Sequence, residues 1–136
     1  MENSRKRGQK VVFIADDDED DRLFLTEALL KVDADTQIVE AENGVELINL
    51  LESTDTDPTL IVLDMNMPLM NGLETFEAIK SIPNIPAIPT VMLSTSSDKL
   101  FVKKAMESGL SDYFVKPYSV QGFFNLATAL KLKYIA

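Results

Sequence analysis

The 136-residue chain contains no cysteine and no histidine. The absence of cysteine excludes disulfide bonds, thiol catalysis and zinc–thiolate sites. The absence of histidine excludes acid–base catalysis by an imidazole, histidine metal ligands and a role as a phosphohistidine carrier. Any metal site in this chain must therefore be built from oxygen ligands.

Long apolar runs are also missing. No run approaches the 18 residues of a membrane span, and no apolar segment follows the charges of the first ten residues, as a secretory signal would require. Basic residues number 13 against 22 acidic ones, and the net charge of −9 disfavours sequence-independent binding to nucleic acid. We therefore expect a cytoplasmic protein that neither inserts into a membrane nor binds DNA directly.

The length of the chain fits one domain, and its segments alternate between two periodicities. Short apolar segments predict strands at 11–15, 36–41, 60–64, 90–93 and 111–115, and each precedes a segment with helical spacing. This alternation predicts an α/β fold, a doubly wound (βα)5 flavodoxin-like three-layer sandwich around a parallel five-stranded sheet of order 2-1-3-4-5. Residues 1–9 are expected to form a flexible N-terminal arm before a domain at 10–136.

Polar residues stand at the ends of four predicted strands. Asp16 and Asp17 follow the first strand, Asp64 ends the third, Ser94 follows the fourth and Lys116 follows the fifth. The carboxyl ends of parallel strands lie along one edge of a sheet, where α/β proteins place their ligands. We therefore expect these side chains to converge in one crevice, near the point where the winding reverses between strands 1 and 3.

Three clustered carboxylates call for a proton or a cation. Two carboxylates about 4 Å apart repel by roughly 4 kcal/mol at an effective dielectric constant near 20. Oxygen ligands favour Mg²⁺, with Mn²⁺ possible. A carboxylate beside such an ion can attack phosphorus and form an aspartyl phosphate, while an ammonium and a hydroxyl stabilise the other phosphoryl oxygens. We interpret Asp64 as the functional centre, assisted by Lys116 and Ser94.

Each of these residues alone also has an ordinary structural interpretation. Asp64 could simply end a strand, Ser94 could bond to local backbone, and Lys116 could be a surface charge. The acidic residues 18–21 predict the solvated start of a helix, and Tyr113 could be half-buried packing. Only their joint placement favours a functional site.

Taken together, the motifs resemble the receiver domain of response regulators, including the chemotaxis receivers, over residues 10–133. The resemblance rests on Asp16-Asp17 after an apolar strand, the segment DMNMPLMNG from Asp64, Ser94-Thr95, and DYFVKP from Asp112 to Pro117. The prolines before the fourth strand and the serine-rich run after it are also similar to stand-alone receivers related to phytochrome-partner regulators.

The resemblance implies a metal site and an acceptor. Asp64 would be the phosphoacceptor. Asp17 would bind Mg²⁺ directly and Asp16 mostly through water, and the backbone carbonyl of Asn66 would complete the ligands from the protein. Asn66 also flanks the site at a position where family members tune the rate of dephosphorylation, as does Ser96.

The resemblance also implies a switch. Ser94, which stands where many family members have threonine, would move to contact the phosphoryl group, and Lys116 would pair with that group. Tyr113 would turn inward when Ser94 moves. The Lys116–Pro117 peptide bond would be cis.

The implied function is that of a single-domain response regulator in a two-component phosphorelay, which is a switch and not an enzyme acting on an external substrate. A sensor histidine kinase or a phosphotransfer protein would donate the phosphoryl group. An unknown downstream protein would bind the changed surface of helix 4, strand 5 and helix 5, where the candidate contacts are Phe101, Tyr113, Tyr118 and Phe123. The chain ends soon after the last predicted helix, so no output domain is expected, and the protein would be a monomer or a phosphorylation-dependent dimer.

Three alternatives stay open. A Mg²⁺ phosphohydrolase could use Asp64 as its nucleophile, although the haloacid-dehalogenase pattern places a second aspartate where this chain has Asn66. An FMN-binding flavodoxin would share the fold, but the loop after the first strand is acidic and does not suit a phosphate. A receiver that has lost phosphotransfer could keep the fold and only bind a partner.

Overall fold

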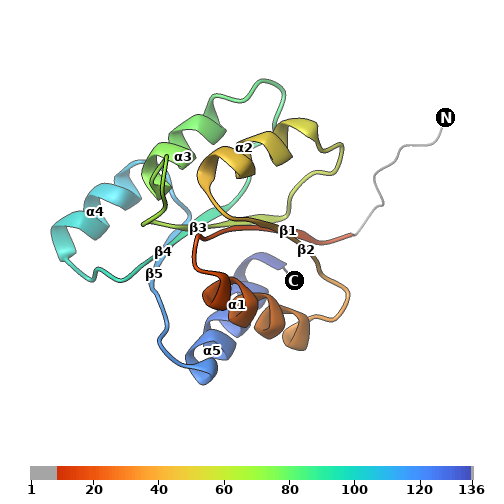
Figure 1. Ribbon diagram of the computed structural model, residues 1–136, viewed down its shortest axis with the longest axis vertical. Helices are drawn as coiled ribbons and strands as arrows, with labels where there is room; N and C mark the ends of the chain where they lie inside the picture. The colour runs from red at the N-terminus through yellow and green to blue at the C-terminus, as the bar shows by residue number, and fades with distance from the viewer. Residues whose placement is uncertain (1–8, 136) are drawn as a thin grey trace.

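The computed structural model describes residues 9–135, and strands alternate with helices throughout (Figure 1). The predicted N-terminal arm, residues 1–9, lies almost entirely outside the described residues, as does residue 136. The strands are β1 (Val11–Ala15), β2 (Gln37–Ala41), β3 (Leu60–Asp64), β4 (Thr90–Ser94) and β5 (Asp112–Val115). The helices are α1 (Glu19–Val32), α2 (Gly44–Ser53), α3 (Gly72–Lys80), α4 (Lys99–Glu107) and α5 (Val120–Leu130).

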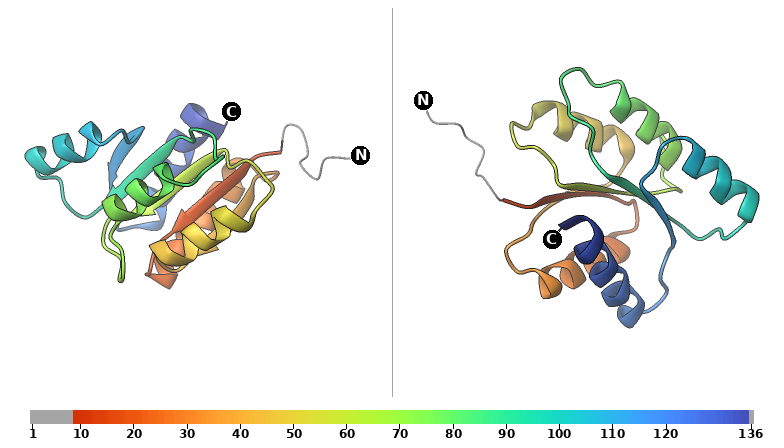
Figure 2. Two further views of the ribbon diagram at one scale, coloured as in Figure 1. Left: turned by 90° about the horizontal axis from the view of Figure 1, so that it is seen from above. Right: turned by 180° about the vertical axis from the view of Figure 1, so that it is seen from behind.

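The five strands form one parallel sheet in the order β2-β1-β3-β4-β5, which confirms the predicted topology. Helices α2, α3 and α4 lie on one side of the sheet, and α1 and α5 lie on the other (Figures 1 and 2). This arrangement follows from right-handed crossovers, which place the helices on opposite faces when the winding reverses. The reversal falls between β1 and β3, so the loops after these two strands meet side by side.

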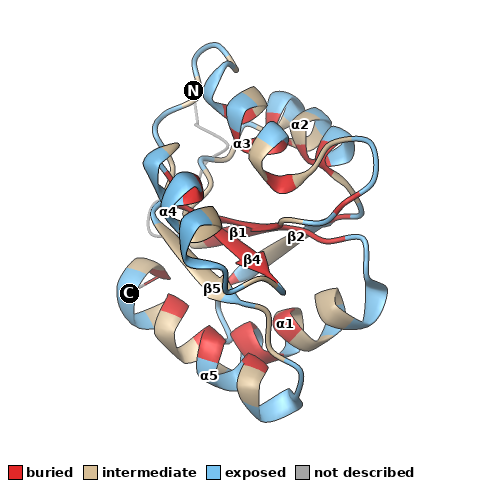
Figure 3. Ribbon diagram, turned by 90° about the vertical axis from the view of Figure 1, so that its left-hand side faces the viewer, coloured by how far each residue is buried: buried red, intermediate tan, exposed pale blue. Residues whose placement is uncertain are grey.

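Alternate residues of each strand enter two separate apolar layers, because successive side chains of a strand point to opposite faces. Phe13 and Leu63 pack in the layer beneath α2 and α3. Ile14 and Val62 pack in the layer beneath α1 and α5. β1, β3 and β4 are buried along their whole length (Figure 3), which explains why their sequences are continuous apolar runs.

The helix ends follow the capping signals of the sequence. The side chain of Asp98 accepts a hydrogen bond from the N–H of Phe101 and caps α4. Gly109 has φ of +110° just after the end of α4, where a left-handed residue ends a helix. Asn71 and Glu74 form a reciprocal capping box at the start of α3.

One feature of the described chain was not predicted. A short π-helix, η1 (Lys131–Ile135), continues α5, and its Ile135 is buried in the layer that α1 and α5 cover. None of the helices in residues 9–135 has the length and apolar character that a membrane span needs.

Candidate functional site

Three aspartates from two loops meet at the carboxyl edge of the sheet. Asp16 and Asp17 follow β1, and Asp64 is the last residue of the neighbouring strand β3. Each of the three offers one carboxylate oxygen, and these oxygens all lie within 4.8 Å of one another. Asp16 and Asp64 are only 3% and 4% exposed, whereas Asp17 faces solvent. The cluster is therefore closed on the protein side and open on one side to a ligand.

Lys116, which follows β5, reaches across the sheet edge into this cluster. Its Nζ atom lies 2.9 Å from Oδ2 of Asp16, 2.9 Å from Oδ2 of Asp21 and 3.5 Å from Oδ2 of Asp64. Burial works to lower the pKa of Lys116, but the hydrogen bonds to Asp21 and Asp16 outweigh it and hold that pKa above its ordinary value. The lysine is therefore a fixed positive charge beside Asp64.

The surroundings of Asp64 disfavour the ionised form of its carboxyl group. Burial and then the charge of Asp16 raise the pKa of Asp64 to about 7, against the opposing influence of Lys116. Burial also raises the pKa of Asp16, although its hydrogen bond with Lys116 works in the other direction. One ammonium group does not fully compensate these carboxylates, so the crevice favours a further cation.

A hard divalent cation suits the oxygen ligands of this site. The available ligands are carboxylate oxygens, which suit Mg²⁺ and Mn²⁺, and neither histidine nor cysteine exists in the chain to favour a softer metal. Asp16, Asp17 and Asp64 would hold the ion. Asn66 is exposed next to them, and its N–H lies 3.4 Å from Oδ1 of Asp64.

Asp21 belongs to the crevice, although its sequence context predicted only the solvated start of a helix. It lies in the first turn of α1 and is an ion-pair partner of Lys116. Asp17 precedes the helix, which begins at Glu19, so no helical spacing relates it to Asp21. The pairing of Asp21 with Lys116 could therefore not be read from the sequence.

Close packing holds the loop between β3 and α3 against the sheet. The N–H of Gly72 donates to the carbonyl of Met65 at 2.8 Å. A Cβ atom at Gly72 would stand 2.8 Å from the backbone oxygen of Asp64 and 2.5 Å from the sulfur of Met92. Position 72 therefore requires glycine, because any larger residue would displace the backbone of Asp64.

Ser94 and Tyr113 lie on adjoining elements beside the crevice. Ser94 is the buried last residue of β4, and its hydroxyl accepts a hydrogen bond from the N–H of Ser96 at 3.1 Å. The hydroxyl of Tyr113 donates to the carbonyl of Ser96 at 2.8 Å, and its ring packs edge-on against Phe101 of α4. The loop after β4 thus connects the serine hydroxyl, the tyrosine and α4 physically.

The prediction of a cis Lys116–Pro117 bond is wrong, because no peptide bond within residues 9–135 is cis. An X–Pro bond favours trans by about 0.5–1 kcal/mol unless tertiary contacts reverse that preference. Here the backbone N–H of Lys116 donates to the carbonyl of Ser94 at 2.7 Å, and the side chain reaches its carboxylate partners with the bond in trans. No cis bond is needed to place the lysine in the crevice.

Comparison with known proteins agrees with this geometry. The sequence profile of the response regulator receiver domain matches residues 12–128, so the chain belongs to that family. The chemotaxis protein CheY homolog of Campylobacter jejuni subsp. jejuni is 32% identical over 110 residues, which cover 81% of this chain and 83% of that protein. The protein is therefore a CheY-like receiver domain of two-component signalling, a class of switches and not of enzymes that turn over a substrate.

Two solved structures resemble the fold over almost its full length. The phosphorylated cyanobacterial phytochrome response regulator RcpA superimposes with a TM-score of 0.82 at 26% identity, covering 94% of this chain and 95% of that one. The Mn²⁺-bound response regulator Rcp1 gives a TM-score of 0.79 at 25% identity, covering 91% and 93%. These likenesses agree with the resemblance to phytochrome-related regulators, and membership of the receiver family disfavours the phosphohydrolase and flavodoxin alternatives.

Proposed function

We propose that this receiver accepts a phosphoryl group on Asp64 and passes the signal on through a change in its surface. The observation that supports the proposal most strongly is the buried carboxylate of Asp64 in one crevice with Asp16 and Asp17, with Nζ of Lys116 3.5 Å away. In this proposal residues 10–136 form the receiver domain and residues 1–9 form an N-terminal arm.

The chemistry is attack by an oxygen of Asp64 on the phosphorus of a phosphohistidine. The new O–P bond forms as the P–N bond breaks, and the imidazole nitrogen leaves with the electron pair. Mg²⁺ held by Asp16, Asp17, Asp64 and the carbonyl of Asn66 would neutralise charge on the transferring group. Lys116, already charged and in place, would pair with the phosphoryl oxygens in the product.

The proposed switch links this chemistry to α4 and β5. The hydroxyl of Ser94 would turn from the N–H of Ser96 toward the phosphoryl group, since the added charge supplies strong acceptor oxygens. The hydroxyl of Tyr113 donates a hydrogen bond to the carbonyl of Ser96, which lies in the loop after β4. Movement of that loop would therefore change the preferred position of the tyrosine ring. Such contacts, made in only one of two states, are what shift an equilibrium between surfaces.

We propose that the phosphoryl donor is a sensor histidine kinase or a phosphotransfer protein in the cytoplasm. The downstream partner would be a protein that binds the surface of α4, β5 and α5. On that surface Tyr118 is fully exposed and Val115 is more than half exposed, whereas Phe123 is buried and is therefore not an available contact. The receiver would act as a monomer or as a phosphorylation-dependent dimer.

The first test uses acetyl phosphate with Mg²⁺ and intact mass spectrometry. The wild-type protein should gain the mass of one phosphoryl group, because a small donor needs no docking surface. Asp64→Asn should gain none, and removal of the metal with EDTA should abolish the gain in the wild type. Asp35→Asn, an exposed aspartate between α1 and β2, should be phosphorylated normally. A full mass gain in Asp64→Asn would overturn the assignment, and an unmodified wild type would favour a receiver that only binds a partner.

A further inference from the structure

Leu69, in the loop between β3 and α3, has a backbone conformation that leucine rarely adopts. Its φ is +72°, in the left-handed region where the Cβ atom collides with the backbone. Among the described residues, the other non-glycine position with positive φ is Asn84, a residue type whose short polar side chain tolerates this region. Leu69 is therefore a strained residue.

The strain comes from a tight turn centred on Leu69. The N–H of Met70 donates to the carbonyl of Pro68 at 2.8 Å, which closes a three-residue γ-turn. With positive φ at its central residue this is the uncommon and strained form of that turn. The buried side chain of Met67 on one side and the helix cap at Asn71 on the other hold the turn in place.

The side chain of Leu69 has little packing within the chain that could compensate for this strain. It is 77% exposed, so most of its apolar surface meets water. A glycine at this position would relieve the strain, and an asparagine would tolerate it better while removing the apolar surface. A strained residue next to a functional site is a reason to look for a role outside the folded monomer.

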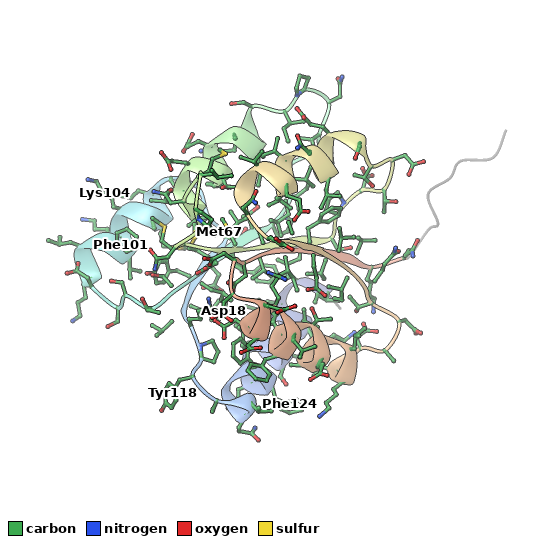
Figure 4. All side chains as sticks on the ribbon, in the orientation of Figure 1. Asp18, Met67, Phe101, Lys104, Tyr118 and Phe124 are labelled. Atoms are coloured by element: carbon green, nitrogen blue, oxygen red, sulfur yellow. The ribbon has the colours of Figure 1, made fainter. Side chains whose placement is uncertain are left out.

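Leu69 lies in the loop that begins directly after Asp64, and this position indicates which kind of partner could bury its side chain. Asp64 is 4% exposed, so a protein that delivers a phosphoryl group to it must lie against the loops around the crevice. Asp18 of the β1–α1 loop and Met67 of the β3–α3 loop lie at this same end of the sheet (Figure 4). Residues 17–20, which run from the β1–α1 loop into the first turn of α1, are all acidic and exposed, and they repel a partner that carries a negative phosphoryl group. Such a partner needs a contact that does not depend on charge.

We propose that Leu69 is a docking residue that packs against an apolar patch on the phosphohistidine-bearing domain of the donor protein. It contributes to recognition of that domain and does not touch the reacting atoms. This inference rests on the proposed function of Asp64 as acceptor, and it adds which loop recognises the donor and by what kind of contact.

The test measures phosphotransfer from purified, autophosphorylated sensor kinases of the source organism, using the kinase that phosphorylates the wild type fastest. Leu69→Asn and Leu69→Gly should each raise KM for the receiver about tenfold, the size expected when an apolar interface contact is lost, and leave kcat within about twofold. Leu69→Met, which keeps an apolar side chain, should stay close to wild type. Leu132→Asn is the matched control, because Leu132 is 73% exposed and lies in η1, away from the crevice.

Two further measurements separate docking from other roles. The rate of phosphorylation by acetyl phosphate should be the same in all four variants, and Leu69→Gly should raise Tm by about 2–4 °C through relief of strain. Unchanged KM in both Leu69→Asn and Leu69→Gly would overturn the inference, as would a parallel loss of the acetyl phosphate reaction. Failure of the wild type to react with acetyl phosphate would instead contradict the role of Asp64 itself.

Discussion

Asp64 is the proposed phosphoacceptor, and burial of its carboxylate also lowers the stability of the fold. Its carboxylate is buried beside Asp16, and burial together with that neighbouring charge raises its pKa to about 7. Its unfolded pKa is near 3.9. The folded metal-free protein therefore binds the proton more tightly than the unfolded chain does, and ionising Asp64 at higher pH destabilises the fold.

Replacing this carboxylate should stabilise the protein when metal is absent. We expect Asp64→Asn in EDTA at pH 8 to raise the free energy of unfolding by on the order of 2 kcal/mol, because an amide carries no charge to bury. The gain should shrink as pH falls from about 7 and should vanish below about pH 4, because the wild-type carboxyl is neutral in both states only below its unfolded pKa. Urea unfolding across this range measures it, and a destabilised variant at pH 8 would contradict the argument.

At the scale of elements, one carboxylate joins three segments of the α1–α5 side. Oδ2 of Asp33, at the carboxyl end of α1, accepts hydrogen bonds of 2.8 Å from Nζ of Lys10 before β1 and 2.8 Å from Nζ of Lys131 in η1. These bonds, first from Lys10 and then from Lys131, hold the pKa of Asp33 well below its ordinary value. The contact explains how the π-helix, which the sequence pattern did not predict, is anchored to the domain.

The ion pairs of Asp33 with Lys10 and Lys131 should contribute to the pH dependence of stability. Because the folded pKa of Asp33 is lowered, its contribution is present above about pH 4, the unfolded value, and is lost as pH falls further. Asp33→Asn should therefore lower Tm at pH 7 and make the loss of Tm below pH 4 less steep. Glu52→Gln, an exposed carboxylate on α2, is the control and should leave both features unchanged. Identical acid profiles for Asp33→Asn and wild type would exclude the contribution.

At the scale of the whole molecule, the crevice depends on strands that are distant in the chain. Asp16, Asp64 and Lys116 come from three strands and meet only when the sheet is formed. A metal ion that binds Asp16, Asp17 and Asp64 in the folded state has no comparable site in the unfolded chain. Metal binding must then stabilise the entire domain and not only the loops that contact the ion.

This linkage gives a quantitative expectation for Mg²⁺. At a concentration ten times its Kd, the ion should add about 1.4 kcal/mol to the free energy of unfolding, as one-site linkage requires. Calorimetric titration supplies the Kd, and unfolding with and without the ion supplies the stabilisation. Asp17→Ala should lose most of the effect, whereas Asp35→Ala should keep it. Equal stabilisation of wild type and Asp17→Ala would remove Asp17 from the site.

Much of the fold could be predicted because its signals are local. Residues 60–63 are continuously apolar since both faces of β3 are covered, and Gly109 follows α4 because a left-handed residue ends a helix. The gathering of Asp16, Asp64 and Lys116 could be anticipated as well, because parallel strands send their carboxyl ends to one edge. These inferences needed only periodicity, capping chemistry and the rules of strand connection.

The sequence by itself determined the order of the elements, the arrangement of the sheet and the set of oxygen ligands available to a metal. Only the tertiary structure decided that Asp21 pairs with Lys116, that the Lys116–Pro117 bond is trans, that η1 is anchored through Asp33 and that Leu69 is both strained and exposed. The physical reason is that these features depend on distances between side chains and on backbone angles in loops. Contacts between distant segments set both, and no local pattern in the chain encodes them.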